Sequence, residues 1–220
     1  MNEVLPSVWL GSMHAAVDET FLAGVGITHI LTAGSGLSIT APSFIKHHMT
    51  LELADTVWDS VLPHVEEGVA FMDGAVKEGG KVLVHCAAGM SRSPSICIAY
   101  AMKALGMTYF QAFKTVKKVR PMTSPNTAFR AQLLLYQKHN FDVKSASNEW
   151  GRCLDSFGIR LYRDPSDGSP TSTAATQRHM EVFYRFDDVS PHSHAEGHIH
   201  EDLEKALGLE GSTAMPLEGG

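Results

Sequence analysis

Several kinds of pattern are missing from this 220-residue chain, and each absence narrows what the chain can be. Its three cysteines form no CxxC pair and no Cys/His finger spacing, which argues against a disulfide framework or a zinc finger. No apolar run approaches the roughly 20 residues that a membrane span requires. The opening MNEVLPSVWL resembles neither a secretory signal nor a myristoylation site. We therefore expect a protein of a reducing compartment, cytoplasmic or nuclear.

Negative charge is scarce in the first two thirds of the chain and concentrated in the last third. Residues 1–144 carry 12 basic and 11 acidic side chains, whereas residues 145–220 carry 6 basic and 13 acidic ones. Residues 164–176, DPSDGSPTSTAAT, have the polar, turn-forming composition of a linker. We predict a folded domain over residues 1–144 and an acidic, largely flexible and partly disordered C-terminal extension over residues 145–220.

The expected elements of the first part alternate between strands and helices. Apolar patterning predicts strands at residues 7–10, 27–31, 44–53 and 81–85. The last of these has a continuous apolar centre, which is typical of a strand buried on both faces of a sheet. Helices are predicted at residues 60–78, 93–105, 108–120 and 127–140. This order indicates an α/β fold in which helices cover a central sheet.

The most informative segment is residues 82–95, VLVHCAAGMSRSPS, in which a short loop from Cys86 to Arg92 joins a strand to a helix. Such a loop can direct its backbone N–H groups to one point, where the N-terminal dipole of the helix adds positive charge. Arg92 supplies a planar fork that matches two oxygens of a phosphate. The sequence therefore predicts a site for a tetrahedral dianion. Its expected backbone donors are Ala87, Ala88, Gly89, Met90, Ser91 and Arg92.

Cys86 has a chemical reason to stand in that loop. A thiol at a helix N-terminus beside an arginine has its pKa lowered to about 3.5–7.5, so it is a thiolate at neutral pH. That thiolate would attack the bound phosphorus in line and form a phosphocysteine intermediate. Ser93 is placed to donate a hydrogen bond to the sulfur, and His85 to orient the loop. The simpler alternative is a buried cysteine that only fills space.

Residues 85–93, HCAAGMSRS, resemble the H-C-x5-R-S signature of the cysteine-dependent dual-specificity protein phosphatases. The stretches PSVWLGSMHAA, GITHIL and VRPMTSPNTAF are also similar to that family, so the resemblance covers about residues 4–144. The segment before the domain is too short for the substrate-docking module of the larger members, so the chain resembles the atypical, stand-alone dual-specificity phosphatases. The resemblance implies a protein tyrosine phosphatase-like fold with a central mixed sheet flanked by helices. It also implies phosphoprotein substrates carrying phosphotyrosine or phosphoserine/threonine, and no metal or organic cofactor.

The resemblance further implies a general acid about thirty residues before the cysteine, because the leaving oxygen must be protonated. Asp55 matches the family position and is preferred, while Asp59 lies beside a predicted helix start and is explained equally by a capping role. Asn126 matches a position that supports the active-site loops in the family, although a turn or cap would select the same residue.

Other chemically suggestive residues have simpler explanations. Cys97 is expected in the core, with a disulfide to an oxidised Cys86 as the alternative, and Cys153 has no evident partner. Four histidines of the tail are explained by a local bias in composition rather than by a metal site: His192, His194, His198 and His200. One run of basic residues is read as a solvated helix face, with docking of an acidic partner or of the tail as the alternative: Lys114, Lys117, Lys118 and Arg120.

Two rival functions remain open at this level. One is a module that binds phosphoproteins without hydrolysing them, which the presence of both Cys86 and an acid candidate disfavours. The other is a phosphatase for a lipid, a glucan or RNA. The loop contains none of the lysines that phosphoinositide phosphatases use, and no carbohydrate-binding module or basic nucleic-acid surface is evident. No membrane or nucleic-acid partner is expected.

Overall fold

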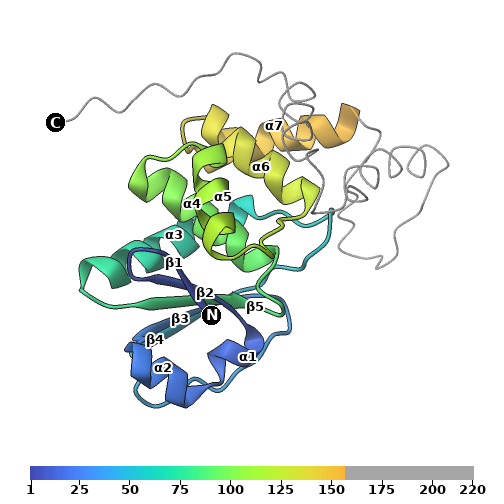
Figure 1. The fold of residues 1–220 in the computed structure, drawn as a ribbon. Helices are drawn as coiled ribbons and strands as arrows, with labels where there is room; N and C mark the ends of the chain where they lie inside the picture. Colours follow the sequence, from blue (N-terminus) through green and yellow to red (C-terminus); the bar gives the residue numbers. More distant parts are fainter. Residues whose placement is uncertain (157–220) are drawn as a thin grey trace. The chain divides into compact units, whose positions relative to one another are not determined.

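The structure is a computed structural model that describes residues 1–156 (Figure 1). The described chain forms two compact units, residues 1–133 and residues 134–156. The first unit contains the sheet and the residues of the candidate site. The predicted flexible linker and the histidine-rich segment lie outside the described residues.

The sheet of the first unit has five strands in the order β1-β2-β5-β3-β4. Their bounds are β1 Asn2–Leu5, β2 Val8–Ser12, β3 His29–Ala33, β4 His47–Leu51 and β5 Val82–Cys86. The first strand runs antiparallel to β2, and the other neighbouring pairs are parallel. β5 is central and buried along its whole length, as its apolar run predicts. The predicted mixed sheet is confirmed.

Helices cover both faces of this sheet (Figure 1). Helices α1 (Met13–Ala16) and α2 (Glu19–Val25) lie on one face. The other face carries α3 (Leu62–Lys77), α4 (Arg92–Leu105) and α5 (Tyr109–Val119). The chain continues through α6 (Thr127–Lys138) and α7 (Val143–Ser156), and the boundary between the two units falls within α6.

Alternation along the buried strands supplies both layers of the core. On one face, Ile30 and Leu83 pack with Leu22 of α2 in a fully buried cluster. On the other face, a glycine lets α3 approach the sheet closely. A β-carbon at Gly68 would lie only 3.0 Å from Cγ2 of Ile96, so a larger residue would push α3 away from α4.

The structure also contains elements that the periodicity did not indicate. β1 is only four residues long and turns back through Ser7, whose φ of 62° is unusual for a residue with a side chain. Most of the polar sequence of α7 falls within the predicted acidic extension. Its start is marked by Asp142, which accepts a hydrogen bond from the Ser145 backbone N–H at 2.6 Å, the arrangement of an N-cap. The predicted boundary between residues 144 and 145 falls inside this helix.

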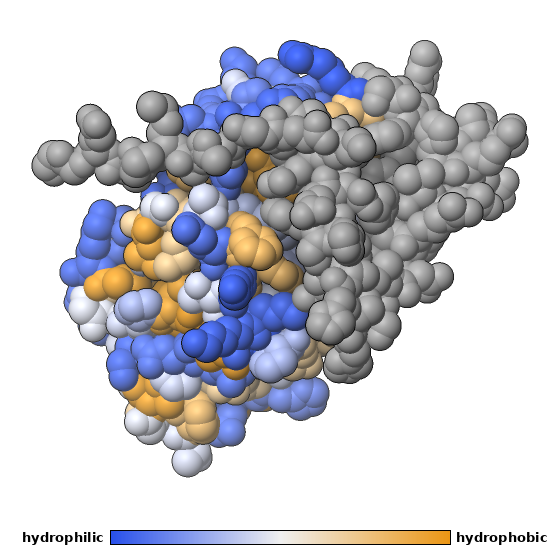
Figure 2. Space-filling view, turned by 45° about the horizontal axis from the view of Figure 1, so that its top comes forward, coloured by the Kyte–Doolittle hydropathy of each residue, from blue (hydrophilic) through white to orange (hydrophobic). Residues whose placement is uncertain are grey.

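Among the described helices, none combines the length and the apolar character that crossing a bilayer would need. On the face that Figure 2 shows, hydrophobic side chains lie in groups between hydrophilic ones. Scattered exposure of this kind is normal for a folded domain.

Candidate active site

The candidate site lies where β5 ends and α4 begins. Cys86 is the last residue of β5, and Arg92 is the first residue of α4. The loop between them, which we call the phosphate loop (residues 87–91), turns at Gly89, where φ is 72°. A β-carbon there would clash with the Gly11 carbonyl oxygen of β2, so glycine is required both by conformation and by space.

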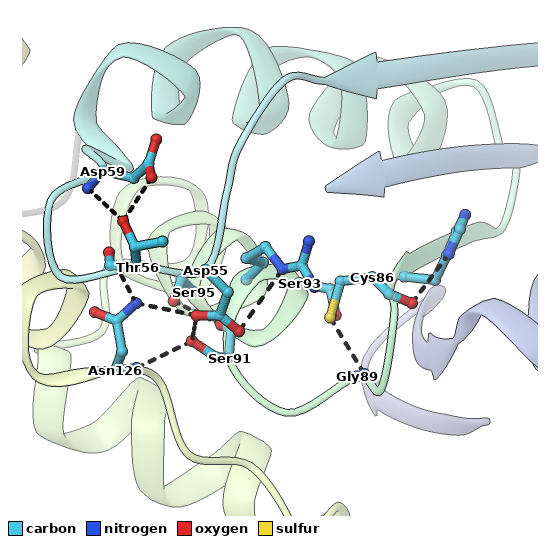
Figure 3. Close-up of polar contacts among 11 residues, drawn as sticks. Asp55, Thr56, Asp59, Cys86, Gly89, Ser91, Ser93, Ser95 and Asn126 are labelled. Carbon is cyan, nitrogen blue, oxygen red and sulfur yellow. Dashed lines mark hydrogen bonds and ion pairs between the residues drawn. The ribbon is translucent and has the colours of Figure 1, made fainter. Parts of the chain in front are cut away.

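The sulfur of Cys86 is almost completely buried and receives two hydrogen bonds (Figure 3). The Ser93 hydroxyl and the Gly89 backbone N–H both donate to it from 3.2 Å. Burial by itself would raise the pKa of the Cys86 thiol. The bonds from Ser93 and Gly89, together with the charge of Arg92, outweigh burial and lower that pKa below its ordinary value. The predicted contact between Ser93 and the sulfur is present.

His85 is buried behind the cysteine and is held by a chain of hydrogen bonds. Its Nδ1 lies 3.4 Å from the Cys86 carbonyl oxygen, which can only accept, so Nδ1 carries the proton. Its Nε2 then accepts from the Thr32 hydroxyl at 2.8 Å, and the Thr32 oxygen in turn accepts from His48 Nε2 at 2.8 Å. Burial lowers the pKa of His85 to about 4, so it is neutral near pH 7. A neutral ring fixed at both nitrogens suits an orienting role.

Asp55 lies beside the phosphate loop and is held by three neighbours (Figure 3). Its Oδ1 accepts from the Ser91 hydroxyl at 2.7 Å and from Asn126 Nδ2 at 3.0 Å. Its Oδ2 lies 3.7 Å from Nε of Arg92. The Nε of Arg92 is buried and has no hydrogen-bond partner within the described residues, so this arginine retains donor capacity for an anion.

The Asp59 carboxylate does not face the phosphate loop, and it is linked to Asn126 only through Thr56 (Figure 3). Its carboxylate accepts a hydrogen bond from the Thr56 hydroxyl at 2.7 Å. Of the two acid candidates, the structure brings only Asp55 together with Arg92 and the phosphate loop.

Asn126 serves both of the roles that the sequence left open. Its side-chain Nδ2 donates to Asp55, and its backbone N–H donates to the Ser91 hydroxyl at 3.0 Å. Its Oδ1 accepts from the Phe129 backbone N–H at 2.9 Å, the contact expected of a cap for α6. The same residue therefore begins a helix and links two loops of the site.

The expectation of a solvated basic face is wrong for Arg120. Its side chain is only 8% exposed, and its guanidinium donates to Asn2 Oδ1 and to two carbonyls of the phosphate loop. The helical pattern of basic residues gave no sign of this, because Arg120 follows the last residue of α5 and leaves the helical path. Lys114 and Lys118 are exposed, as expected.

The two remaining cysteines differ in their surroundings. Cys97 is a free, fully buried thiol on α4, and burial raises its pKa well above the ordinary value. Cys153 is half-buried. Within the described residues, no group of three or more metal-binding side chains gathers, and the tail histidines lie outside that range.

Comparison with known proteins identifies the family. The profile described as "Dual specificity phosphatase, catalytic domain" matches residues 8–139. Dual specificity protein phosphatase 5 of Rattus norvegicus is 39% identical over 135 residues, which are 61% of this chain and 35% of that protein. The chain thus spans about a third of the length of that curated relative.

Solved structures agree with this match. Human DUSP28 has 33% identity and a TM-score of 0.61, covering 64% of this chain and 95% of the other. The human tyrosine phosphatase-like serine/threonine/tyrosine-interacting protein has 33% identity and a TM-score of 0.61, covering 64% of this chain and 98% of the other. With the strand, loop and helix around Cys86 in place, the chain belongs to the dual-specificity phosphatase catalytic-domain family.

Proposed function

We propose that this protein hydrolyses phosphotyrosine and phosphoserine/threonine in phosphoproteins through a phosphocysteine intermediate. The observation that carries the proposal is the convergence of three groups. The buried thiol of Cys86, with its lowered pKa, lies on the same loop–helix junction as Arg92, and the Asp55 carboxylate lies 3.7 Å from that arginine. A nucleophile, an anion-binding fork and a proton donor are the parts that phosphoryl transfer to sulfur requires.

The proposed reaction has two steps. The Cys86 thiolate attacks phosphorus, the bond from phosphorus to the substrate oxygen breaks, and Asp55 gives its proton to the departing oxygen. A water molecule then attacks the phosphocysteine while Asp55 accepts its proton, which releases inorganic phosphate and restores the thiolate. The Ser93 hydrogen bond stabilises the sulfur as it leaves. Arg92 and the backbone N–H groups of the phosphate loop bind the phosphoryl oxygens as charge develops.

Two alternatives remain beside this proposal. One is a module that binds phosphoproteins without hydrolysing them, as the name of the human serine/threonine/tyrosine-interacting protein suggests for that neighbour. This chain contains both Cys86 and a positioned Asp55, which binding alone does not require. The other alternative is a non-protein phosphate. Residues 87–91 contain no lysine to hold additional phosphates, which favours a single phosphoryl group on a protein.

The proposed nucleophile also bears on where the protein acts. A thiolate is open to oxidation, and thiols are kept reduced in the cytoplasm and nucleus, so we infer that the protein acts there, with phosphoproteins as partners.

The proposal is tested by Cys86→Ser with Cys153→Ser as the matched control. Phosphate release is measured from phosphotyrosine and phosphothreonine peptides, a phosphoinositide and a 5′-phosphorylated RNA. Cys86→Ser should abolish release, because a serine hydroxyl is not ionised at neutral pH, whereas Cys153→Ser should retain it. The unaltered protein should prefer the peptides. Turnover by Cys86→Ser would refute the mechanism, and preference for the lipid or the RNA would refute the substrate class.

A further inference from the structure

The carbonyl oxygens of the phosphate loop all point away from the anion site, and each is held by a donor outside the loop. The Ala87 carbonyl accepts from Met13 N at 3.1 Å, and the Met90 carbonyl accepts from Ser124 N at 2.7 Å. Arg120 donates to two carbonyls, from Nη2 to Ala88 at 3.1 Å and from Nε to Gly89 at 2.8 Å. The Ser91 carbonyl accepts from the backbone N–H of Ser95 at 3.1 Å and from its hydroxyl at 2.8 Å. In a trans peptide the C=O and the following N–H point in opposite directions. Fixing these carbonyls outward therefore directs the N–H groups of the next residues toward the phosphoryl position.

In the peptide group between Ala88 and Gly89, both the outward carbonyl and the inward N–H have observed partners. The Ala88 carbonyl accepts from Arg120 on the outer side of the loop, while the Gly89 N–H of the same peptide donates to the Cys86 sulfur at 3.2 Å. Rotation of that peptide would remove a donor from the sulfur and turn a carbonyl dipole toward the anion. Arg120 resists the rotation, and its second bond, to the Gly89 carbonyl, fixes the next peptide in the same sense.

Arg120 is itself fixed from two directions. Its backbone N–H donates to Val116 of α5 at 2.9 Å, and its Nη1 donates to Asn2 Oδ1 of β1 at 2.9 Å. Within the described residues, it forms no ion pair with a carboxylate. A buried cation without an anionic partner is costly, and Cys86 is one of the groups whose negative charge favours the charged form of Arg120.

We propose that Arg120 is a positioning residue of this site. Its guanidinium holds the Ala88 and Gly89 carbonyls outward from behind the phosphate loop, so that the loop presents its N–H groups and a buried positive charge to the thiolate and the phosphoryl group. This inference rests on the proposed function only in that the loop binds a phosphoryl group. It gives Asn2 of β1 a role as the outer anchor of the same guanidinium.

The test compares Arg120→Gln and Arg120→Lys with Lys118→Gln, which removes an exposed charge from the neighbouring helix surface. Three quantities are measured: inhibition by inorganic phosphate, kcat/KM for a phosphopeptide, and the pH midpoint of Cys86 alkylation by iodoacetamide, read by mass spectrometry of the Cys86 peptide. The titratable groups that interact with that thiol are Arg92, Arg120 and the buried Cys97, while His85 beside it is neutral.

Arg120→Gln should weaken phosphate inhibition and lower kcat/KM by about 100-fold, the usual effect of losing a preorganised donor set. Its alkylation midpoint should move to higher pH. Arg120→Lys should fall between the two, because an ammonium retains the charge but not the fork. Lys118→Gln should match the unaltered protein. Folded Arg120→Gln protein with unchanged phosphate inhibition and alkylation midpoint would show that Arg120 is merely structural and overturn the inference.

A second variant covers the case in which Arg120→Gln does not fold. Asn2→Asp retains both bonds to the loop but pairs Nη1 with a carboxylate, so it should raise the alkylation midpoint and weaken phosphate inhibition. No change in either quantity would overturn the inference. Because the alkylation midpoint is measured without any substrate, a chain that failed to hydrolyse phosphopeptides would refute the proposed function and leave this part of the test intact.

Discussion

Asp55 and Asp59 are four residues apart in one loop, yet their surroundings give them different chemistry. Asp55 faces Arg92 and the phosphate loop, whereas Asp59 accepts its hydrogen bond from Thr56. A general acid matters in proportion to how poorly the leaving group departs without a proton. The two carboxylates can therefore be distinguished by changing the leaving group.

Asp55→Asn should slow hydrolysis of phosphotyrosine and phosphoserine peptides by about 10²–10⁴-fold, and hydrolysis of an activated aryl phosphate much less. Asp59→Asn is the matched control, and should leave the leaving-group dependence unchanged at a cost of about 1 kcal/mol of stability, because it weakens one hydrogen bond from Thr56. Steady-state kinetics on both substrate types measures this. Exchanged phenotypes would make Asp59 the acid, and no leaving-group dependence in either variant would exclude both residues.

His85 makes the folding stability depend on pH. Its pKa is about 4 in the folded protein, against 6.5 for an unperturbed histidine. Between these values the unfolded chain binds the proton and the folded protein does not, so stability falls as the pH falls through this window. The contribution is fully present above about pH 6.5, and about 2–3 kcal/mol of it should be lost by pH 4.5.

Urea unfolding at about pH 7 and about pH 4.5 measures this loss. His85→Gln should be less stable at neutral pH but should show a smaller drop between the two pH values. His14→Gln, which alters an exposed histidine, should retain the full drop. An equal drop in His85→Gln and the unaltered protein would refute the assignment.

At the scale of the element, the start of α3 is held by a residue of another helix. The N-cap position of α3, Val61, has no side chain that can cap. Gln132 of α6 takes this role, because its Oε1 accepts from the Val61 N–H at 2.9 Å and from the Ser60 hydroxyl at 2.8 Å. Its Nε2 donates to the Asp59 carbonyl at 3.1 Å. The loop that carries Asp55 is thus tied to α6 at its end.

Gln132→Ala should destabilise the protein by about 1–3 kcal/mol, because a buried N–H loses its acceptor. It should also lower kcat for phosphopeptides by loosening the loop. Gln111→Ala, which alters an exposed capping residue of α5, serves as the control and should leave kcat unchanged. Denaturant unfolding and kinetics measure the two effects. Unchanged stability in Gln132→Ala would contradict the capping role.

At the scale of the whole molecule, the acidic segment beyond the described residues gives a testable electrostatic effect. Residues 157–220 contain 5 basic and 11 acidic side chains, a net charge of −6. Deleting them should raise kcat/KM for phosphopeptides at low ionic strength, because like charges repel, and the gain should fade at about 0.5 M salt. A variant that retains residues 157–220 with the acidic residues changed to amides separates charge from length. An unchanged kcat/KM at low salt would show that residues 157–220 have no electrostatic effect on catalysis.

The sequence determined the elements whose pattern is local. The apolar run of β5, the capping box at Thr108 and the motif from His85 to Ser93 each predicted the observed element, because strand burial, helix capping and loop chemistry depend on neighbouring residues. The boundaries agree within a few residues. Four observed elements were not predicted: β1, α1, α2 and α7. Their local signals are weak, because β1 and α1 have four residues each, α2 has seven, and α7 has a mostly polar sequence.

The tertiary structure decided the contacts between residues far apart in the chain. Asp55 and Asn126 meet because two loops converge on the phosphate loop, and no spacing in the sequence encodes that distance. Arg120 is buried rather than solvated, because the chain turns at the end of α5. Its guanidinium lies behind the phosphate loop and donates to two carbonyls there. The sequence by itself thus determined the strand, loop and helix around Cys86 and predicted the chemistry of that residue. Only the fold decided which distant side chains orient that chemistry, because buried polar groups are satisfied by whichever partner packing brings to them.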